Sequence, residues 1–306
     1  MPSNQTPLGA LPARFRRLRV LVVGCGDVGQ RAAGLLHGVH VLALTSSPER
    51  RAALRRQGIT PLRGDLDQAG TLARLAGLAQ RVIHLAPPPS AGRVDSRTVN
   101  LVRALRLRGV PDALVYGSTS GVYGDCQGQL VPETRSPHPQ SPRAQRRAHA
   151  ESVLRAVGRA TGVRVSLLRI PGIYAMDRPG GSPLERVRRG TPVLQVQDDV
   201  YTSHIHADDL ARACVLALWR GRAQRVVNVN DDTRLLMGDY FDQVADGAGL
   251  ARPPRLSRTQ APTQLTPMQM SFLGESRRLD NQRMKRELRL RLRYPTVVDG
   301  LRPAPG

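Results

Sequence analysis

The chain has 306 residues, 40% of them hydrophobic, and a formal net charge of +22 at pH 7. This length is enough for one large α/β domain, or two smaller ones, with a sizeable buried core. No stretch approaches the ~18 to 20 uninterrupted apolar residues of a membrane span, and residues 1–18 lack the apolar core of a signal peptide. We therefore expect a soluble cytoplasmic protein with no membrane partner.

The positive charge alone would suggest a nucleic-acid partner. However, Lys285 is the only lysine among the 46 basic residues, and the arginines are spread along the whole chain. This distribution indicates a general bias towards arginine rather than a specific nucleic-acid surface, and aromatic residues that could stack on bases are few. The scattered Cys25, Cys126 and Cys214 indicate a reducing compartment, without a disulfide framework or a metal site.

Residues 19–23 are mostly branched and apolar and predict a buried strand, and three glycines spaced G-x-G-x-x-G follow them. Gly24 would permit a tight turn, and Gly26 would let phosphate oxygens approach the backbone. Gly29 would let the helix expected over residues 31–36 pack close to the strand. Free N–H groups at the helix start favour an anion. The pattern predicts that this loop binds a dinucleotide pyrophosphate; the alternative is a turn that serves the fold alone.

A second buried strand is predicted over residues 39–44 and ends about 20 residues beyond the glycines. An NAD-specific site usually has a carboxylate here, on the ribose 2′-hydroxyl. Instead Thr45 and Ser46 follow the strand, with Arg50 and Arg51 close behind. Hydroxyls beside an arginine suit a 2′-phosphate, so the sequence favours NADP over NAD. Both arginines could equally be solvated helix residues.

Predicted strands and helices alternate through the first half of the chain. Strands are expected over residues 59–62, 81–86 and 163–170 and from residue 113, and helices over residues 48–57, 95–107 and 142–160. Such alternation implies right-handed crossovers and a parallel sheet whose ligands bind at the carboxyl ends of the strands. The expected fold class is a Rossmann-type, doubly wound α/β fold with a smaller C-terminal substrate lobe. Residues 276–291 are expected to form a basic helix.

Short motifs occur along the chain in an order that is typical of one family. After the glycine loop they are Gly64–Leu66, His84–Ala86, Ser118–Gly124, Leu168–Tyr174, His204–Ala211, Val227–Asp232 and Ser276–Asn281. In this order the chain resembles the extended short-chain dehydrogenase/reductases, the NAD-dependent epimerase/dehydratase superfamily, over roughly residues 19–301. The resemblance implies an NAD(P)-binding oxidoreductase or epimerase/dehydratase-like enzyme that acts on a carbonyl or secondary alcohol, with sugar nucleotides among the candidate substrates.

The resemblance also implies which residues contact the cofactor. They are Gly24, Gly26, Asp27, Val28 and Gly29 at the pyrophosphate, Asp65 and Leu66 beside the adenine, and Leu85, Ala86 and Pro87 at the end of a strand that lines the cofactor. For each of these positions, ordinary packing at a strand end is the alternative.

The family's catalytic serine or threonine precedes the tyrosine of its V-Y-G motif by four residues, and that position is Thr119. A hydroxyl here would hydrogen-bond a substrate carbonyl or hydroxyl at the carboxyl end of the strand. Ser118 and Ser120 are the alternatives if the register shifts by one residue.

The chain departs from the family pattern in the helix over residues 142–160, where relatives carry Y-x-x-x-K. Arg143 stands at the tyrosine position and Arg147 at the lysine position, one helical turn apart on the same face. Arginine stays protonated and has no acceptor, so Arg143 cannot exchange a proton as tyrosine does. Arg147 could still hydrogen-bond ribose hydroxyls or a phosphate.

Three explanations fit a member of the family without this tyrosine. Another residue transfers the proton, or the protein binds the cofactor without turnover, or the fold has a non-redox role. Tyr123, His149 and Tyr174 are the candidates for a replacement acid or base, with packing or a solvated helix face as the alternative for each. The rival to an enzyme is therefore a non-catalytic NAD(P)-binding sensor or assembly protein.

The motif at residues 204–209 has two histidines and two aspartates. These residue types could bind a metal, but the resemblance implies that Asp208 or Asp209 caps the helix that follows. No metal is expected.

The predicted domain organisation has five parts. Residues 1–18 form a flexible basic lead-in, and residues 19–175 form the NAD(P)-binding domain. Residues 176–301 mainly form a substrate lobe, with segments around 199–230 returning to the first domain, and residues 302–306 form a frayed tail. A small-molecule substrate is the expected partner, and a homodimer is compatible with this organisation.

Overall fold

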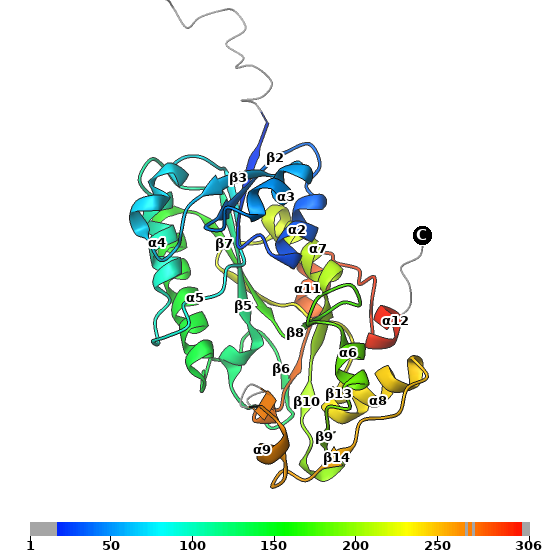
Figure 1. Ribbon diagram of the computed structural model, residues 1–306. Coiled ribbons are helices and arrows are strands. Elements are labelled where there is room, and N and C mark those ends of the chain that lie inside the picture. The colour runs from blue at the N-terminus through cyan, green and yellow to red at the C-terminus, as the bar shows by residue number, and fades with distance from the viewer. Residues whose placement is uncertain (1–16, 267–268, 271–272, 302–306) are drawn as a thin grey trace, which may run out of the picture.

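The protein is organised around a seven-stranded sheet, as the computed structural model of residues 17–266, 269–270 and 273–301 shows (Figure 1). The strand order is β12-β7-β5-β4-β1-β2-β3, and each neighbouring pair is parallel. In chain order the strands are β1 (Arg19–Val23), β2 (His40–Thr45), β3 (Thr60–Arg63), β4 (Arg81–His84), β5 (Ala113–Thr119), β7 (Arg164–Ile170) and β12 (Arg225–Asn228). The order reverses between β1 and β4, as in a doubly wound sheet. The predicted Rossmann-type fold class is confirmed.

Helices cover both faces of the sheet, and β1 separates the two cores. Val20 and Val22 lie in one core, whereas Leu21 and Val23 lie in the other, because successive side chains of a strand point to opposite faces. The first core is covered by α2 (Asp27–Gly34), α3 (Arg50–Arg56), α7 (Ala207–Arg220) and α11 (Gln282–Glu287), and the second by α4 (Ser96–Leu105), α5 (Pro142–Thr161) and a 3₁₀ helix over Ala69–Leu75. Burial on both faces explains why the strands have continuous apolar runs.

The 20-residue helix α5 illustrates why the sequence predicted the main helices well. The Ser141 side chain accepts a hydrogen bond from the Ala144 N–H (3.2 Å), and Pro142 occupies the first turn. Gly162, with φ of 77°, ends the helix in the left-handed conformation. These start and stop signals are local, and the helix predicted over residues 142–160 is confirmed.

A third apolar core lies away from the sheet, at the lower right of Figure 1. Val193, Phe241 and Leu273 are among its buried side chains. The elements of this part are α6 (Pro183–Arg188), α8 (Met237–Gly247), α9 (Ala261–Gln264), α12 (Val297–Leu301), a 3₁₀ helix over Val196–Asp198, and the strand pairs β9 (Val193–Leu194) with β14 (Arg255–Leu256) and β10 (Tyr201–Thr202) with β13 (Leu235–Leu236). The division into a cofactor domain and a substrate lobe stays a prediction. Most of the predicted lead-in (residues 1–16) and the whole predicted tail (302–306) lie outside the described residues.

The prediction of one basic helix over residues 276–291 is wrong. Here β15 (Arg278–Leu279) pairs in parallel with β6 (Leu130–Val131), and helix α11 includes only Gln282–Glu287. The buried Asn281 amide donates hydrogen bonds to two backbone carbonyls that follow β12 (3.0 Å each). The apolar residues of this segment have helical spacing, but strand pairing and the Asn281 hydrogen bonds to the backbone determine its structure. Neither of these contacts can be recognised from the neighbouring sequence.

Candidate functional site

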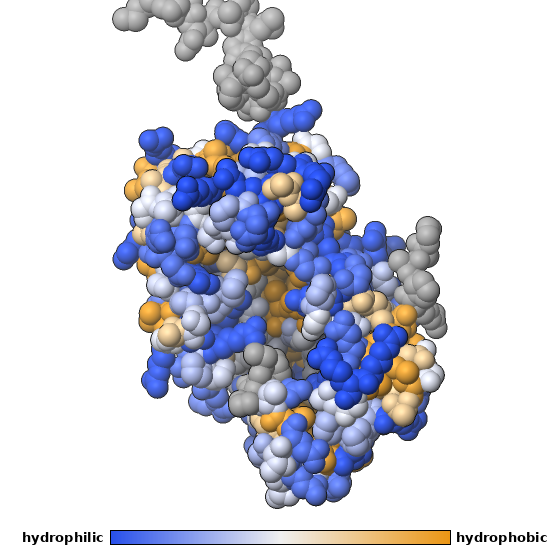
Figure 2. Space-filling model, in the orientation of Figure 1, coloured by the Kyte–Doolittle hydropathy of each residue, from blue (hydrophilic) through white to orange (hydrophobic). Residues whose placement is uncertain are grey.

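A cavity of about 220 Å³ lies at the carboxyl ends of β1, β4, β5 and β7, and we call it the glycine-loop cavity. Its lining residues are Gly24, Gly26, Asp27, Val28, Gly29, Leu85, Gly117, Ser118, Thr119, Arg143, Arg147, Ile170, Pro171, Ile173, Arg178 and Leu210. The face of the molecule drawn in Figure 2 is hollowed near its middle, where hydrophobic residues show between hydrophilic rims. The structure thus brings together the predicted glycine loop, the predicted catalytic Thr119 and both arginines of α5.

The three glycines of the loop occupy their positions for different structural reasons. Gly24 has φ of 84°, and a Cβ there would lie 2.3 Å from the Ala86 nitrogen, so the turn tolerates no side chain. A Cβ on Gly29 would lie 2.9 Å from the Gly24 carbonyl oxygen, so a glycine is needed here for α2 to pack closely on the loop. A Cβ on Gly26 would meet no protein atom within 4 Å. The fold therefore leaves space for a ligand at Gly26, at the start of α2, where N–H groups lack helical partners.

The end of β2 lies beside this loop. The Arg50 guanidinium donates a hydrogen bond to the Cys25 carbonyl. Thr45 is buried, and its hydroxyl accepts a hydrogen bond from the Ser47 N–H (3.2 Å), whereas Ser46 is exposed. Within the described chain, Arg50 and Ser46 are the groups of this strand end that are available to a ligand next to the loop.

The remaining predicted cofactor positions divide into two sets. Leu85 lines the glycine-loop cavity, while Ala86 is buried behind it. Pro87 is exposed, and Asp65 and Leu66 follow β3; none of these three is among the lining residues. The Asp65 carboxylate accepts a hydrogen bond from the Asp67 N–H (2.9 Å).

Thr119 is the last residue of β5, and its hydroxyl oxygen accepts a hydrogen bond from the Gly121 N–H (3.2 Å). Its hydroxyl proton remains available for a ligand in the cavity. The neighbouring Ser118 differs, because its hydroxyl donates to the buried Glu151 carboxylate (2.6 Å). Ser120 is buried and does not line the cavity. Of the three hydroxyls considered from the sequence, Thr119 has the geometry that suits an orienting role.

Arg143 and Arg147 both line the cavity from α5. Arg143 is exposed, whereas Arg147 is buried and its Nη1 donates to the Gly117 carbonyl (2.8 Å) and the Ala86 carbonyl (3.2 Å). The same Nη1 donates to the Tyr116 hydroxyl (3.0 Å), and burial raises the pKa of Tyr116 to about 12. Arg147 therefore holds the ends of β4 and β5 together, while Arg143 is free to meet a ligand.

The three candidates for a replacement acid or base do not line the glycine-loop cavity. The buried Tyr123 hydroxyl donates to the Asn228 side chain (2.7 Å), and burial raises its pKa. The His149 ring accepts from the Asp95 N–H (3.2 Å), and the Tyr174 hydroxyl donates to the Thr296 carbonyl (3.1 Å). Each side chain has a structural partner instead.

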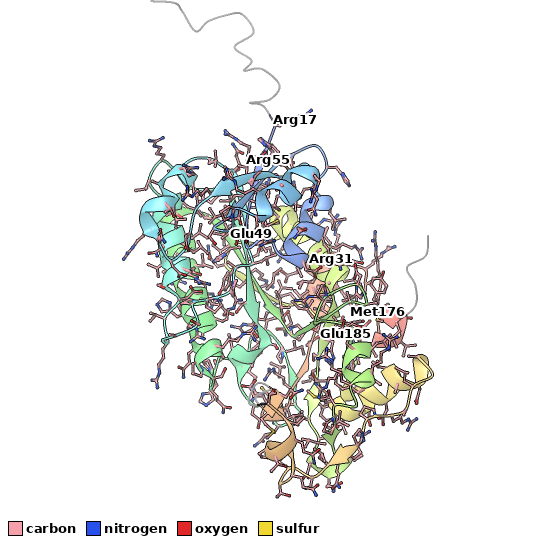
Figure 3. The ribbon with its side chains drawn as sticks, viewed as in Figure 1. Arg17, Arg31, Glu49, Arg55, Met176 and Glu185 are labelled. Atoms are coloured by element: carbon pink, nitrogen blue, oxygen red, sulfur yellow. The ribbon has the colours of Figure 1, made fainter. Side chains whose placement is uncertain are left out.

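Sequence reasoning missed a network of charges beside the loop. The Arg31 guanidinium on α2 donates to Asp27 (2.9 Å), Asp177 (2.7 Å) and Asp208 (2.5 Å). Figure 3 labels Arg31 and Met176, the residue before Asp177, on two of the segments that the network joins. The hydrogen bond from Arg31 lowers the pKa of Asp177. No motif announces this network, because its aspartates come from three separate segments.

Arg178 extends the network into the cavity. Its Nε lies 3.3 Å from the Asp27 carboxylate, and its Nη1 donates to the Ile173 carbonyl (2.9 Å). Arg178 lies on the chain that follows β8 (Gly172–Tyr174), which pairs with β11 (His204–His206). A positive side chain from beyond β8 therefore lies against the glycine loop.

The prediction that Asp208 or Asp209 caps α7 is wrong. The His206 side chain accepts from the Asp208 N–H at the helix start (3.2 Å), while Asp208 pairs with Arg31. The Asp209 carboxylate accepts from the N–H groups of Arg293 and Tyr294 (2.9 Å each). Tertiary partners take both carboxylates away from the helix terminus.

The described residues contain neither a candidate metal site nor a candidate membrane-spanning helix. Within residues 17–266, 269–270 and 273–301, no three His, Cys, Asp or Glu side chains are grouped so that they could hold a metal ion. None of the helices in the same ranges has the length and apolar character needed to cross a membrane.

Comparison with known proteins identifies relatives of the chain. A curated relative, GDP-6-deoxy-D-mannose reductase from Pseudomonas aeruginosa, is 28% identical over 253 residues, which cover 74% of this chain and 79% of the relative. A conserved protein of unknown function from Silicibacter pomeroyi has a similar structure, with a TM-score of 0.75, 27% identity and coverage of 92% of this chain and 96% of that chain.

A further similar structure is the dTDP-glucose 4,6-dehydratase DesIV from Streptomyces venezuelae, a double mutant with NAD bound, with a TM-score of 0.74 at 23% identity and coverage of 93% of this chain and 94% of that chain. Residues 20–230 match the family model described as the NAD dependent epimerase/dehydratase family. This match extends over more than half of the chain and confirms the predicted class of NAD(P)-binding oxidoreductases and epimerases. The chain belongs to the NAD-dependent epimerase/dehydratase family.

Proposed function

We propose that the protein binds NADP(H) in the glycine-loop cavity and uses it to oxidise or reduce a sugar nucleotide at a carbonyl or secondary alcohol. The observation that carries this proposal is the meeting of the glycine loop, the Thr119 hydroxyl and the Arg143 guanidinium in one cavity. The alternative on the same fold is a non-catalytic NAD(P)-binding sensor or assembly protein.

The residues at the loop fit a dinucleotide phosphate. The open space at Gly26 and the start of α2 suit the pyrophosphate, because unpaired N–H groups and the helix dipole favour anions. Arg178 lies against the same loop and adds a positive charge. Arg50, held at the Cys25 carbonyl, suits the 2′-phosphate of NADP, and no carboxylate takes the place that would favour NAD.

Sugar nucleotides are the proposed substrate class for two reasons. The curated relative is a GDP-6-deoxy-D-mannose reductase, and the structural relative DesIV is a dTDP-glucose 4,6-dehydratase. Both names describe sugars linked to nucleoside diphosphates. Arg143 is exposed at the cavity and can provide the charge-assisted hydrogen bonds that such an anionic substrate needs.

The nicotinamide supplies hydride transfer when the cofactor is bound. Thr119 orients the reacting substrate oxygen, because its own oxygen is occupied by the Gly121 N–H and its proton is free to donate. Arg143 stabilises negative charge on that oxygen but keeps its own proton. The proton of the reduced product comes from solvent, since the tyrosine and histidine candidates are held elsewhere.

Gly26→Val is the decisive variant, with Gly34→Ala as its matched control. A Cβ at Gly26 would meet no protein atom within 4 Å, so we expect the variant to fold normally but to lose NADPH binding by about tenfold or more in a nicotinamide fluorescence titration. Gly34 is on the same helix, also has open space, and should bind as the native chain does. Normal NADPH binding by Gly26→Val would overturn the proposed site.

Titration with NADPH and NADH in parallel tests the cofactor preference, for which we expect tighter NADPH binding. Turnover is then assayed with GDP-, dTDP- and UDP-linked keto-sugars. Cofactor binding without turnover across this set would favour the sensor or assembly role. Light scattering of the purified protein tests whether it forms the homodimer that is compatible with the predicted domain organisation.

A further inference from the structure

A second cavity, of about 330 Å³, lies at the edge of the sheet beside β7 and β12, and we call it the arginine cavity. Its lining residues are Glu133, Thr134, Arg135, Ser136, Pro137, Arg155, Arg169, Gln224, Arg225, Val226 and Arg283. Five of these are arginines and one is a carboxylate. The cavity shares no lining residue with the glycine-loop cavity.

Adjacent residues of β7 belong to the two different cavities. Ile170 lines the glycine-loop cavity and Arg169 lines the arginine cavity, because successive side chains of a strand point to opposite faces of the sheet. The arginine cavity is therefore a separate place on the molecule and not an extension of the cofactor site.

Arg169 is the buried floor of the arginine cavity, with 1% of its surface exposed. Its Nε and Nη2 donate to the Glu151 carboxylate at 3.1 and 2.7 Å. Its Nη1 is also buried and has no hydrogen-bond partner among the described residues, although the guanidinium carbon lies 4.5 Å from the centre of the Tyr123 ring. A buried charged donor without an acceptor is costly, and a ligand oxygen in the cavity would remove that cost.

The arginines of the cavity outnumber the carboxylates that pair with them. Glu151 pairs with Arg169, Glu287 pairs with Arg225, and Arg283 lies 3.5 Å from Glu133. Arg135 and Arg155 are the lining arginines outside these three pairs.

Neither of the two remaining arginines has an acidic partner within the described part of the chain. Arg135 donates to the neutral side chain of Gln129 (2.8 Å). Arg155 forms no ion pair there, and its Nε is buried without a hydrogen-bond partner. The arginine cavity thus has two positive charges without an acidic partner, on Arg135 and Arg155, and two buried N–H donors without a hydrogen-bond acceptor, Arg155 Nε and Arg169 Nη1, in the described part of the chain.

We propose that the arginine cavity binds the phosphoryl group of a small phosphorylated ligand. Guanidinium groups match phosphate oxygens with paired N–H donors, and they keep their charge at every physiological pH. The cavity has room for a phosphate or a sugar phosphate, since small-molecule sites begin at about 300 Å³. Arg155 and Arg135 hold the phosphoryl oxygens, and Arg169 Nη1 donates to one of them.

The test is calorimetric titration of the full chain in a buffer free of phosphate and sulfate. Inorganic phosphate and ribose 5-phosphate are titrated separately, so that a free ion and a phosphorylated metabolite are distinguished. We expect at least one of them to bind, and the Arg135→Gln/Arg155→Gln double variant to bind it at least tenfold more weakly. Absence of binding by the native chain to both probes would overturn the proposal.

Two control variants separate this site from general attraction to a basic protein. Arg159→Gln removes one exposed charge of the same helix, one turn beyond Arg155, and should leave binding unchanged. Arg178→Gln detects phosphate that binds at the glycine-loop cavity instead, because Arg178 lies against that loop. Equal losses in Arg159→Gln and the double variant, or a loss confined to Arg178→Gln, would refute the arginine cavity as the site.

The Arg155→Lys variant covers the case in which the double variant does not fold, as judged by its circular dichroism. It keeps the positive charge but loses the planar pair of donors, so we expect about threefold or greater weakening. Binding by a folded Arg155→Lys variant as tight as that of the native chain would contradict the proposed contact.

Discussion

The two cavities are both lined by arginines, but they differ in what these arginines contact. In the glycine-loop cavity, Arg147 donates to three protein oxygens and Arg178 bonds to the Ile173 carbonyl beside Asp27. In the arginine cavity, Arg155 and Arg135 have no acidic partner within the described chain. The first cavity therefore combines two arginines held by protein oxygens with Arg143, which is free to meet a ligand, whereas the second has two arginines without an acidic partner among the described residues.

This difference shows why composition was a poor guide to function here. The chain has a net charge of +22, and arginines are found along its whole length. Most surface arginines are solvated or in weak ion pairs that contribute little. The arginines with a proposed binding role are distinguished by their place at a site, as Arg143 and Arg155 are, and not by the abundance of arginine in the chain. Three predictions probe the contrast, from the largest expected effect to the smallest.

Glu151→Gln has the largest expected effect, because Glu151 connects the two cavities. Its carboxylate pairs with Arg169 of the arginine cavity and accepts from Ser118 of the glycine-loop cavity. The change leaves the buried Arg169 charge without a counterion and should lower the free energy of unfolding by about 3–5 kcal/mol. Urea unfolding followed by circular dichroism measures this loss.

Glu185→Gln is the control for Glu151→Gln, since Glu185 pairs with Arg189 on the exposed surface. Such pairs contribute ~1 kcal/mol or less, so its unfolding curve should stay close to that of the native chain. Equal stability of Glu151→Gln and the native chain would show that the two cavities are not joined by a buried ion pair.

Thr119→Val tests whether the Thr119 hydroxyl orients the reacting oxygen in the glycine-loop cavity. Loss of one hydroxyl donor at the reacting oxygen should lower kcat about 10²-fold, while NADPH binding stays unchanged. Steady-state kinetics with the substrate found in the assays above measures this effect. Thr119→Ser keeps the hydroxyl and should retain most of the activity. A Thr119→Val variant with native kcat would move the orienting role to another residue.

The glycine-loop cavity could be predicted from the sequence because its parts are local. Gly24, Gly26 and Gly29 are within six residues, and Thr119 ends a strand marked by the motif that follows it. The spacing of Arg143 and Arg147 on one helix also placed both at the cavity. Patterns of this kind depend on neighbouring residues, so they can be recognised from the sequence without knowledge of tertiary contacts.

The remaining features depend on contacts between distant segments, and the sequence did not reveal them. Arg31 meets aspartates from three segments, and the arginine cavity is assembled from residues between 133 and 283. The misassigned helix over residues 276–291 has the same origin, because β15 forms only beside β6. The spacing of residues in the sequence does not predict which arginines have a hydrogen-bond acceptor in the folded protein.

The smallest expected effect is on how the free energy of unfolding changes with pH. It distinguishes the two cavities, because His84 behind the glycine-loop cavity titrates and the arginines of the arginine cavity do not. His84 is buried at the end of β4 beside Leu85, and its ring is 3.0 Å from the Thr98 hydroxyl. Burial lowers the pKa of His84 to about 4, with Asp95 opposing this shift and Arg147 adding to it. Since the unfolded chain takes up this proton near pH 6.5 and the folded chain does so only near pH 4, acidification between these values favours unfolding.

His84→Gln should therefore remove part of this pH dependence. Between pH 7 and pH 5, the native chain should lose about 2 kcal/mol more unfolding free energy than the variant, as measured by urea unfolding at both values. Arg155→Gln should have the slope of the native chain, because arginine does not titrate in this range. If His84→Gln and the native chain lost equal stability, the folded protein would take up the His84 proton at the same pH as the unfolded chain, and the interior behind the glycine-loop cavity would tolerate a charge as the arginine cavity does.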